Sequence, residues 1–148
     1  MPAPRPSRFA PRVSRLYSRM PDLFSPAGIT AWRTHLETSE EFHRAARGWT
    51  GTVLLVEGGA AEAKRSTWIA IDDGAIREAR PDNGADQTAA EFVLSADAGT
   101  WEALTRGREE LLGAAMRGAL RLERGQVWRL LPHAKAAAAM LRAAGDAP

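Results

Sequence analysis

The chain has 148 residues, enough for one domain, and it carries a formal net charge of +2. It contains no cysteine, which excludes disulfides, thiolate metal sites and cysteine nucleophiles. No apolar run approaches the length of about 18 residues that marks a membrane-spanning helix, and the start lacks the apolar core of a secretion signal, so we expect a cytoplasmic protein.

The first 25 residues differ in composition from the remainder. Residues 1–20 contain five arginines and no acidic residue, whereas the rest of the chain carries 15 basic and 18 acidic side chains. Early prolines disfavour helices and strands, so we expect residues 1–25 to be a flexible Pro/Arg-rich arm and residues 26–145 to be a domain. The alternative role for the arm is to contact a partner protein or an anionic membrane surface through its charge.

The first predicted element of the domain is one helix over residues 27–47. Apolar residues from Ile29 to Phe42 recur there at three- and four-residue steps, which places them on one helical face. Gly48 then ends the helix.

The pattern next changes to that of strands. Residues 52–59 form a short apolar run, and residues 66–82 read as two strands joined by Asp73-Gly74. That dipeptide tolerates the positive φ angles of a tight hairpin turn. A fourth strand is predicted over residues 90–97.

The remaining part combines short helices with one strand. Thr100 is the expected N-cap of a helix over 101–106. The elements that follow are a helix over 108–117, a strand over 119–123 and a last helix that begins at Pro132. Hairpins join most of the strands, so the sequence predicts an α+β fold, a five-stranded mostly antiparallel sheet with helices packed on one face.

Candidate catalytic and metal-binding groups have simpler explanations. Glu40 and His43 have the i, i+3 spacing of di-iron bundles, but the sequence holds no second copy of that motif. Asp73 is accounted for by the hairpin turn. Three scattered histidines make no metal site, and acidic residues beside the strands count against nucleic acid as a partner. We therefore predict no catalytic residue, no metal ion and no cofactor.

The order of the elements resembles that of the sterol carrier protein type 2 family, in its small bacterial form. The stretch EFVLSADAGTWEALTRGREELLGAAMRGALRLERG is similar to the family's succession of a strand, two helices, a small residue with glycine, and a strand. The stretch AWRTHLETSEEFHRAARGWTGTVLLV is similar to the family's passage from helix to strand. The resemblance spans about residues 28–145, and Arg124-Gly125-Gln126 departs from it where the family has glycine followed by Asp or Asn.

The resemblance implies that the sheet and helices enclose a hydrophobic tunnel for a fatty acyl chain, a sterol or another lipid. Each buried CH₂ contributes roughly 0.8 kcal/mol, so an acyl chain needs no special polar group to bind. We expect Met116→Trp to fill the tunnel, unless these side chains pack together without a cavity. The residues expected to line it are Trp68, Phe92, Leu94, Trp101, Leu104, Leu111, Leu112, Met116, Leu120, Leu122 and Met140.

Two other functions stay open on the sequence alone. One is an enzyme that uses the same pocket on a hydrophobic biosynthetic intermediate, with His35, His43, Asp72 or Asp97 as acid–base candidates. The other is an accessory subunit that presents a lipid-like substrate to a partner enzyme, with the arginine arm as its docking segment. A homodimer is compatible with each of these functions.

Overall fold

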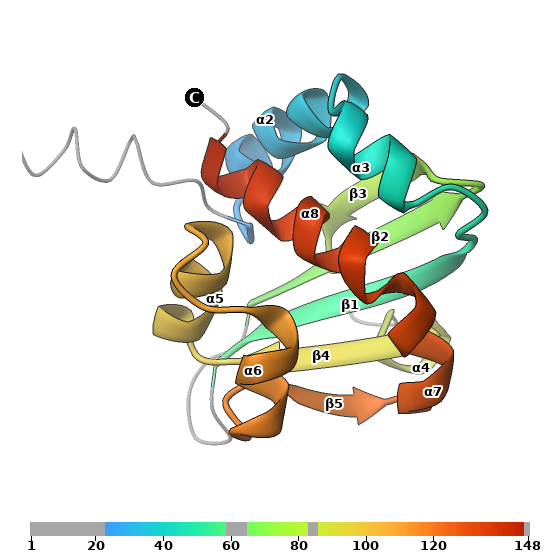
Figure 1. The fold of residues 1–148 in the computed structure, drawn as a ribbon. Coiled ribbons are helices and arrows are strands. Elements are labelled where there is room, and N and C mark those ends of the chain that lie inside the picture. The colour runs from blue at the N-terminus through green and yellow to red at the C-terminus, as the bar shows by residue number, and fades with distance from the viewer. Residues whose placement is uncertain (1–22, 59–64, 83–85, 147–148) are drawn as a thin grey trace, which may run out of the picture.

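The computed structural model describes residues 23–58, 65–82 and 86–146 of the chain (Figure 1). The strands are β1 (Gly51–Glu57), β2 (Arg65–Asp72), β3 (Ala75–Pro81), β4 (Phe92–Ala96) and β5 (Arg121–Arg124). The helical elements are α2 (Pro26–Glu37), α3 (Glu40–Ala45), α4 (Asp86–Ala89), α5 (Ala98–Thr105), α6 (Leu111–Met116), α7 (Val127–Leu130), the 3-10 turn η1 (Leu131–His133) and α8 (Ala134–Asp146).

The five strands form one sheet in the order β3-β2-β1-β4-β5. Strand β1 pairs antiparallel with β2 and parallel with β4, and the β2–β3 and β4–β5 pairs are antiparallel. The expected five-stranded, mostly antiparallel sheet is therefore confirmed. Its hairpin turns at Asp73 and Gly74, whose φ angles of 50° and 82° match the left-handed conformation that this dipeptide tolerates.

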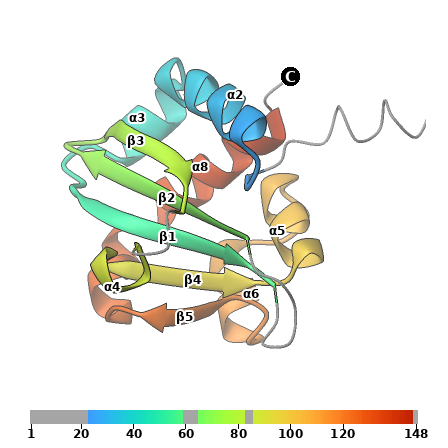
Figure 2. The same ribbon diagram turned by 180° about the vertical axis from the view of Figure 1, so that it is seen from behind.

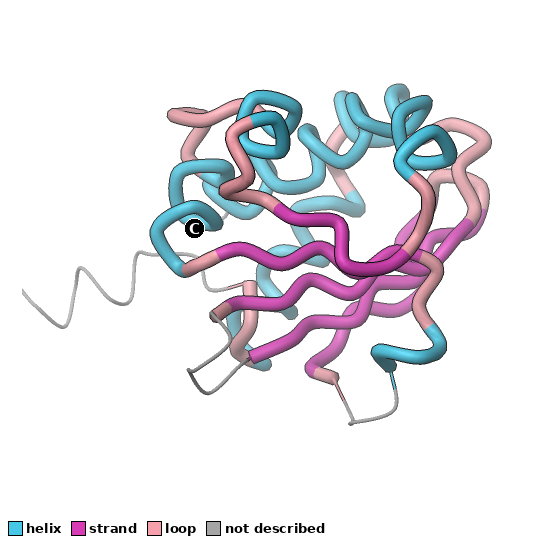
Figure 3. The backbone as a smooth tube through the Cα atoms, turned by 90° about the horizontal axis from the view of Figure 1, so that it is seen from below, coloured by secondary structure: helices cyan, strands magenta, loops and turns pink. Residues whose placement is uncertain are grey.

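The longer helices lie together on one side of the sheet (Figures 1 and 3). Helix α8 crosses that side and packs against α2, α3, α5 and α6, while α2 also contacts the edge strand β3. The reverse view shows the strands in front, with the four-residue α4 at one end of β4 (Figure 2). The expected α+β arrangement is confirmed.

Three details of the predicted helices are wrong, and two short helices were not predicted. The helix over 27–47 is broken into α2 and α3, because Ser39 starts a new helix by accepting a hydrogen bond from the backbone N–H of Phe42. Helix α5 is capped by Asp97 and not by Thr100, whose own N–H donates to the Asp97 carboxylate at 2.8 Å. Pro132 lies in η1 and precedes the last helix, and the short elements α4 and α7 were not predicted.

The apolar core consists of two clusters on opposite faces of the sheet. Successive strand residues point to opposite faces, so Val53 faces the helices and its neighbour Leu54 faces the reverse side. The larger cluster, between sheet and helices, includes Leu23 and Phe24, which precede α2. The smaller cluster on the reverse side comprises Leu54, Val56, Trp68, Ala90 and Val93. The arm over 1–25 stays a prediction, since residues 1–22 lie outside the described residues.

Candidate functional site

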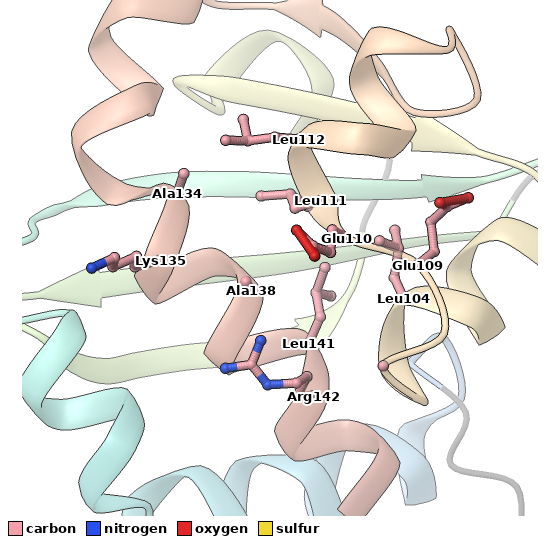
Figure 4. Close-up of a pocket in the computed structure, with 11 residues that line it drawn as sticks. Leu104, Glu109, Glu110, Leu111, Leu112, Ala134, Lys135, Ala138, Leu141 and Arg142 are labelled. Atoms are coloured by element: carbon pink, nitrogen blue, oxygen red, sulfur yellow. The ribbon is translucent and has the colours of Figure 1, made fainter.

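A pocket of about 480 Å³ lies between α8, α6 and the loop that joins α5 to α6 (Figure 4). Its polar margin carries Glu109 and Glu110 from the loop and α6 side, and Lys135 and Arg142 from α8. The apolar residues that line it are Leu104, Leu111, Leu112, Ala134, Ala138 and Leu141. The pocket therefore presents an apolar interior with charged groups at its margin.

The spacing of residues along α8 and α6 explains why the pocket forms. Ala134, Ala138 and Leu141 are four and three residues apart, so they lie on one face of α8. The two alanines leave room that larger side chains would fill. Opposite them, Leu111 is buried with 7% exposure, whereas Leu112 is 49% exposed and projects from α6 towards Ala134 (Figure 4).

The charged groups at the margin differ in their partners. Glu109 pairs with Arg117, and Arg142 pairs with Glu41 on α3. Within the described part of the chain, Lys135 has no carboxylate within ion-pair distance, so its ammonium group is available to a ligand. Glu110, at the start of α6, likewise has no ionic partner among the described residues, so the pocket combines apolar walls with one unpaired cation and one unpaired anion at its margin.

The structure brings together only part of the predicted lining. Leu104, Leu111 and Leu112 line the pocket. A further group lies in or against the larger core cluster without lining this pocket, namely Phe92, Leu94, Trp101, Leu120, Leu122 and Met140. That these six residues also contact a ligand bound in the interior stays a prediction.

Two of the predicted lining residues lie elsewhere. Trp68 belongs to the cluster on the reverse face, because it pairs with Leu54 across β1 and points away from Phe92. The Met116 side chain is 87% exposed, so Met116→Trp is no longer expected to fill a cavity.

Of the residues in α8, the sequence pointed to Met140 alone, and not to the face of the helix that lines this pocket. The alanines of α8 indicate a stable helix, but Ala134, Ala138 and Leu141 also mark one helical face, and that spacing is the signal that identifies the pocket wall. Lys135 follows the first of them. A single lysine on a helix gives no sequence signal of its own, because only the three-dimensional structure shows whether a carboxylate lies within ion-pair distance.

The acid–base candidates lie on different elements, His35 on α2, His43 on α3, Asp72 at the end of β2 and Asp97 at the start of α5. Asp97 caps α5, and the backbone N–H and hydroxyl of Thr100 lower the pKa of its carboxyl group. Glu40, His43 and Asp73 do meet at a pocket of about 400 Å³ between α3 and the β2–β3 turn, but all three are exposed to solvent.

Among residues 23–58, 65–82 and 86–146, no group of three or more His, Asp or Glu side chains is placed to hold a metal ion. Over the same residues, no helix has the length and apolar character needed to cross a bilayer.

Solved structures share this fold along most of the chain. A crystal structure of sterol carrier protein 2 has 32% sequence identity and a TM-score of 0.76, covering 86% of this chain and 100% of that one. A conserved hypothetical protein of Thermus thermophilus, described as possibly a sterol carrier protein, has 32% identity and a TM-score of 0.72, covering 85% and 90%. Sterol carrier protein-2 like-3 of Aedes aegypti, at 12% identity and a TM-score of 0.51 over 70% and 88%, shares the fold alone. No protein-family model matches the sequence, and no curated protein matches it.

Proposed function

This chain belongs to the sterol carrier protein 2 family, and from that premise we propose that it binds a hydrophobic ligand. The ligand is a fatty acyl chain, a sterol or a related lipid. It occupies an apolar cavity between the sheet and the helices, and the pocket between α6 and α8 is the entrance. The observation that carries the proposal is this apolar pocket beside α8 in a fold shared with sterol carrier protein 2.

The size and lining of the pocket support a lipid ligand. Its volume of about 480 Å³ falls within the range of roughly 300–1,000 Å³ typical of small-molecule sites. Leu104, Leu111 and Leu141 belong to both the pocket wall and the larger core cluster, so a guest would be in direct contact with the core. Ten buried methylenes contribute about 8 kcal/mol before the ordering costs of binding, which leaves room for micromolar affinity.

The packing of α8 indicates beside which part of this helix a ligand can enter. At the C-terminal end of α8, Gly145 lies against the backbone of Thr105 on α5. This contact is too close for a ligand to pass between the two helices. The pocket lies along the other part of α8, from Ala134 to Leu141. An acyl chain would therefore enter between that part of α8 and α6.

The proposal is tested by narrowing the pocket at Ala138, which is partly buried and packs against the larger core cluster. In the Ala138→Phe variant a phenyl ring displaces about two ligand methylenes, so we expect about tenfold weaker binding of a fluorescent fatty acid. Ala27→Phe is the matched control, because Ala27 is exposed on α2 and does not line the pocket. Both variants are first compared with the natural protein for cooperative thermal unfolding.

Two results would contradict the proposal. One is equal fatty-acid affinity in Ala138→Phe and Ala27→Phe, which would remove the pocket as the binding site. The other is the lack of any apolar molecule bound either to the purified protein, by mass spectrometry after denaturing extraction, or after incubation with fatty acid.

A further inference from the structure

The charged side chains at the margin of the pocket are sorted by sign between two elements. Glu109 and Glu110 lie just before α6, whereas Lys135 and Arg142 belong to α8 (Figure 4). Helix α6 packs against α8, so the acidic edge and the basic edge of the pocket face each other. The entrance therefore carries negative charge along one edge and positive charge along the other.

Glu110 is the acidic group that is free to meet a ligand. It is the N-cap residue of α6, but its carboxylate does not accept a hydrogen bond from the first turn of that helix, as an N-cap side chain commonly does. Over the residues that the structure describes, it forms no hydrogen bond and no ion pair. The neighbouring Glu109 is engaged by Arg117. Since Glu110 is also exposed, a ligand reaches its carboxylate without displacing a protein group.

The basic edge lies along one side of α8. Lys135 and Arg142 are seven residues apart, close to two helical turns, so their side chains leave the helix in similar directions. In the described part of the chain, no carboxylate lies within ion-pair distance of Lys135. Arg142 pairs with Glu41 between exposed groups, and a pair of that kind is weak. Lys135 is therefore the main free cation of this edge, with Arg142 as a second positive charge two turns further along the helix.

We propose that the pocket selects a single-chain lipid with a zwitterionic head group. Its ammonium group lies beside Glu110 and its acidic group beside Lys135, while the chain extends along the apolar wall that includes Leu111, Ala138 and Leu141. A head group with one charge would pair with one edge and meet like charge at the other, whereas a zwitterion pairs with both. The inference rests on the proposed function, because it names the class of ligand that enters the same pocket.

The exposure of the two free charges sets the depth of the head group. Glu110 and Lys135 are exposed to solvent, whereas Leu111 and Leu141 on the pocket wall are buried. Moving an ammonium or acidic group past these leucines into apolar surroundings, away from its partners, costs far more than each buried methylene contributes. The head group therefore stays at the entrance. Each of its two contacts is an exposed ion pair, so each contributes a factor of about five at most.

The experiment compares three ligands that share a myristoyl chain and differ in head-group charge. Myristate is an anion, myristoylcholine is a cation and myristoylcarnitine is a zwitterion. Each competes with a fluorescent fatty acid for the full chain, at neutral pH and below its critical micelle concentration. We expect myristoylcarnitine to bind about fivefold more tightly than either singly charged ligand, and this advantage should shrink at high salt.

Glu110→Gln tests the acidic edge by removing one charge at nearly constant size. Myristoylcarnitine should then bind about fivefold more weakly, because its ammonium group loses its partner. Myristate should bind about twofold more tightly, because the negative charge near its carboxylate is gone. A change in the shape of the pocket would act on the shared acyl chain and shift both affinities in the same direction. Opposite shifts therefore identify a role in charge recognition.

Lys135→Gln tests the basic edge and should give the reverse pattern. We expect about fivefold weaker binding of myristoylcarnitine and about twofold tighter binding of myristoylcholine. Glu40→Gln is the matched control. Like Glu110, Glu40 is an exposed glutamate at the start of a six-residue helix, but it does not line the pocket. All three ligands should bind this variant within about twofold of the natural protein.

The outcomes separate this inference from the proposed function. If neither the fluorescent fatty acid nor any of the three ligands binds, both fail. If the three ligands bind with equal affinity, or if Glu110→Gln shifts myristoylcarnitine and myristate by the same factor, the pocket holds lipids but does not select a zwitterion. Tightest binding of myristate would identify an anionic ligand and tightest binding of myristoylcholine a cationic one, and either result would overturn the inference.

Discussion

Gly145 of α8 and Thr105 of α5 are in direct backbone contact. A Cβ atom added at Gly145 would lie 1.9 Å from the carbonyl oxygen of Thr105. That oxygen belongs to the helix backbone, so it cannot move aside by a change of rotamer as a side-chain atom could. The crossing of α5 and α8 therefore requires the absence of a side chain at this position.

We expect Gly145→Ala to lower the free energy of unfolding by about 2 kcal/mol, because the two helices must separate to admit the methyl group. Gly113 of α6 is the matched control, since an added Cβ there meets nothing within 4 Å. Gly113→Ala should stabilise the protein by about 0.5–1 kcal/mol through higher helix propensity. Urea unfolding of both variants measures the difference, and equal stabilities would show that the two helices are not closely packed.

Trp101 fastens α5 to the sheet through a buried hydrogen bond. Its Nε1–H donates to the carbonyl oxygen of Val56 at 2.9 Å, and the side chain is 2% exposed. Trp101→Phe removes the donor and leaves space beside the ring, so we expect a loss of about 2–3 kcal/mol. Trp128→Phe, at a side chain of α7 that is 63% exposed, should change stability by less than about 0.5 kcal/mol. Thermal and chemical unfolding would contradict this assignment if both substitutions had the same effect.

Much of this fold could be predicted from the sequence because local signals agreed with the tertiary structure. Asp73-Gly74 specifies a hairpin turn, and both residues have the expected positive φ. The alternation of apolar residues identified the strands, but not which face is covered by helices. Trp68 was therefore included in the predicted lining, although it lies in the cluster on the reverse face of the sheet.

The candidate site was harder to predict than the fold for a physical reason. A pocket exists where side chains fail to fill space, and local sequence patterns do not report unfilled space. Leu111 and Leu112 are adjacent in sequence, yet one is buried and the other is half exposed. The interruption at Ser39 was missed for a related reason, since the apolar period continues through it and only the N-cap hydrogen bond reveals the break.

The Asp97 cap should give stability that depends on pH. Hydrogen bonds from the backbone N–H and hydroxyl of Thr100 lower its pKa in the folded protein. A group with a lowered folded pKa contributes stability above its unfolded pKa, near 3.9, and loses that contribution as the pH falls through the folded value. Asp97→Ala should therefore cost about 1 kcal/mol at neutral pH and progressively less below about pH 4. Unfolding curves at several pH values test this, and a difference independent of pH would contradict it.

Arg80 stabilises the buried carboxylate of Asp86. Its guanidinium donates to both oxygens, at 2.9 and 3.1 Å, and these bonds, together with one to Glu78, raise the pKa of Arg80. Arg80→Ala should cost about 2 kcal/mol, since it takes the guanidinium away from a carboxylate whose side chain is 5% exposed. Arg77 is the control, because its contact with Asp72 spans 3.9 Å between exposed groups and Arg77→Ala should cost less than about 0.5 kcal/mol. Equal costs for the two substitutions would show that burial of Asp86 carries no penalty.

Lys135 should select ligands by their head group. It lies at the margin of the pocket on α8 without a carboxylate partner among the described residues, while the unpaired Glu110 lies on the α6 side, so a fatty acid should place its carboxylate beside the ammonium group and away from Glu110. Lys135→Gln should weaken binding of a fatty acid by about fivefold, which is the effect expected for one exposed ion pair. Binding of the fatty alcohol of the same chain length should be unchanged, because the apolar contacts are the same. Competition against a fluorescent fatty acid, at low and high salt, measures both ligands. An equal loss for acid and alcohol would mean that Lys135 supports the shape of the pocket, and no loss for either would place the head group elsewhere.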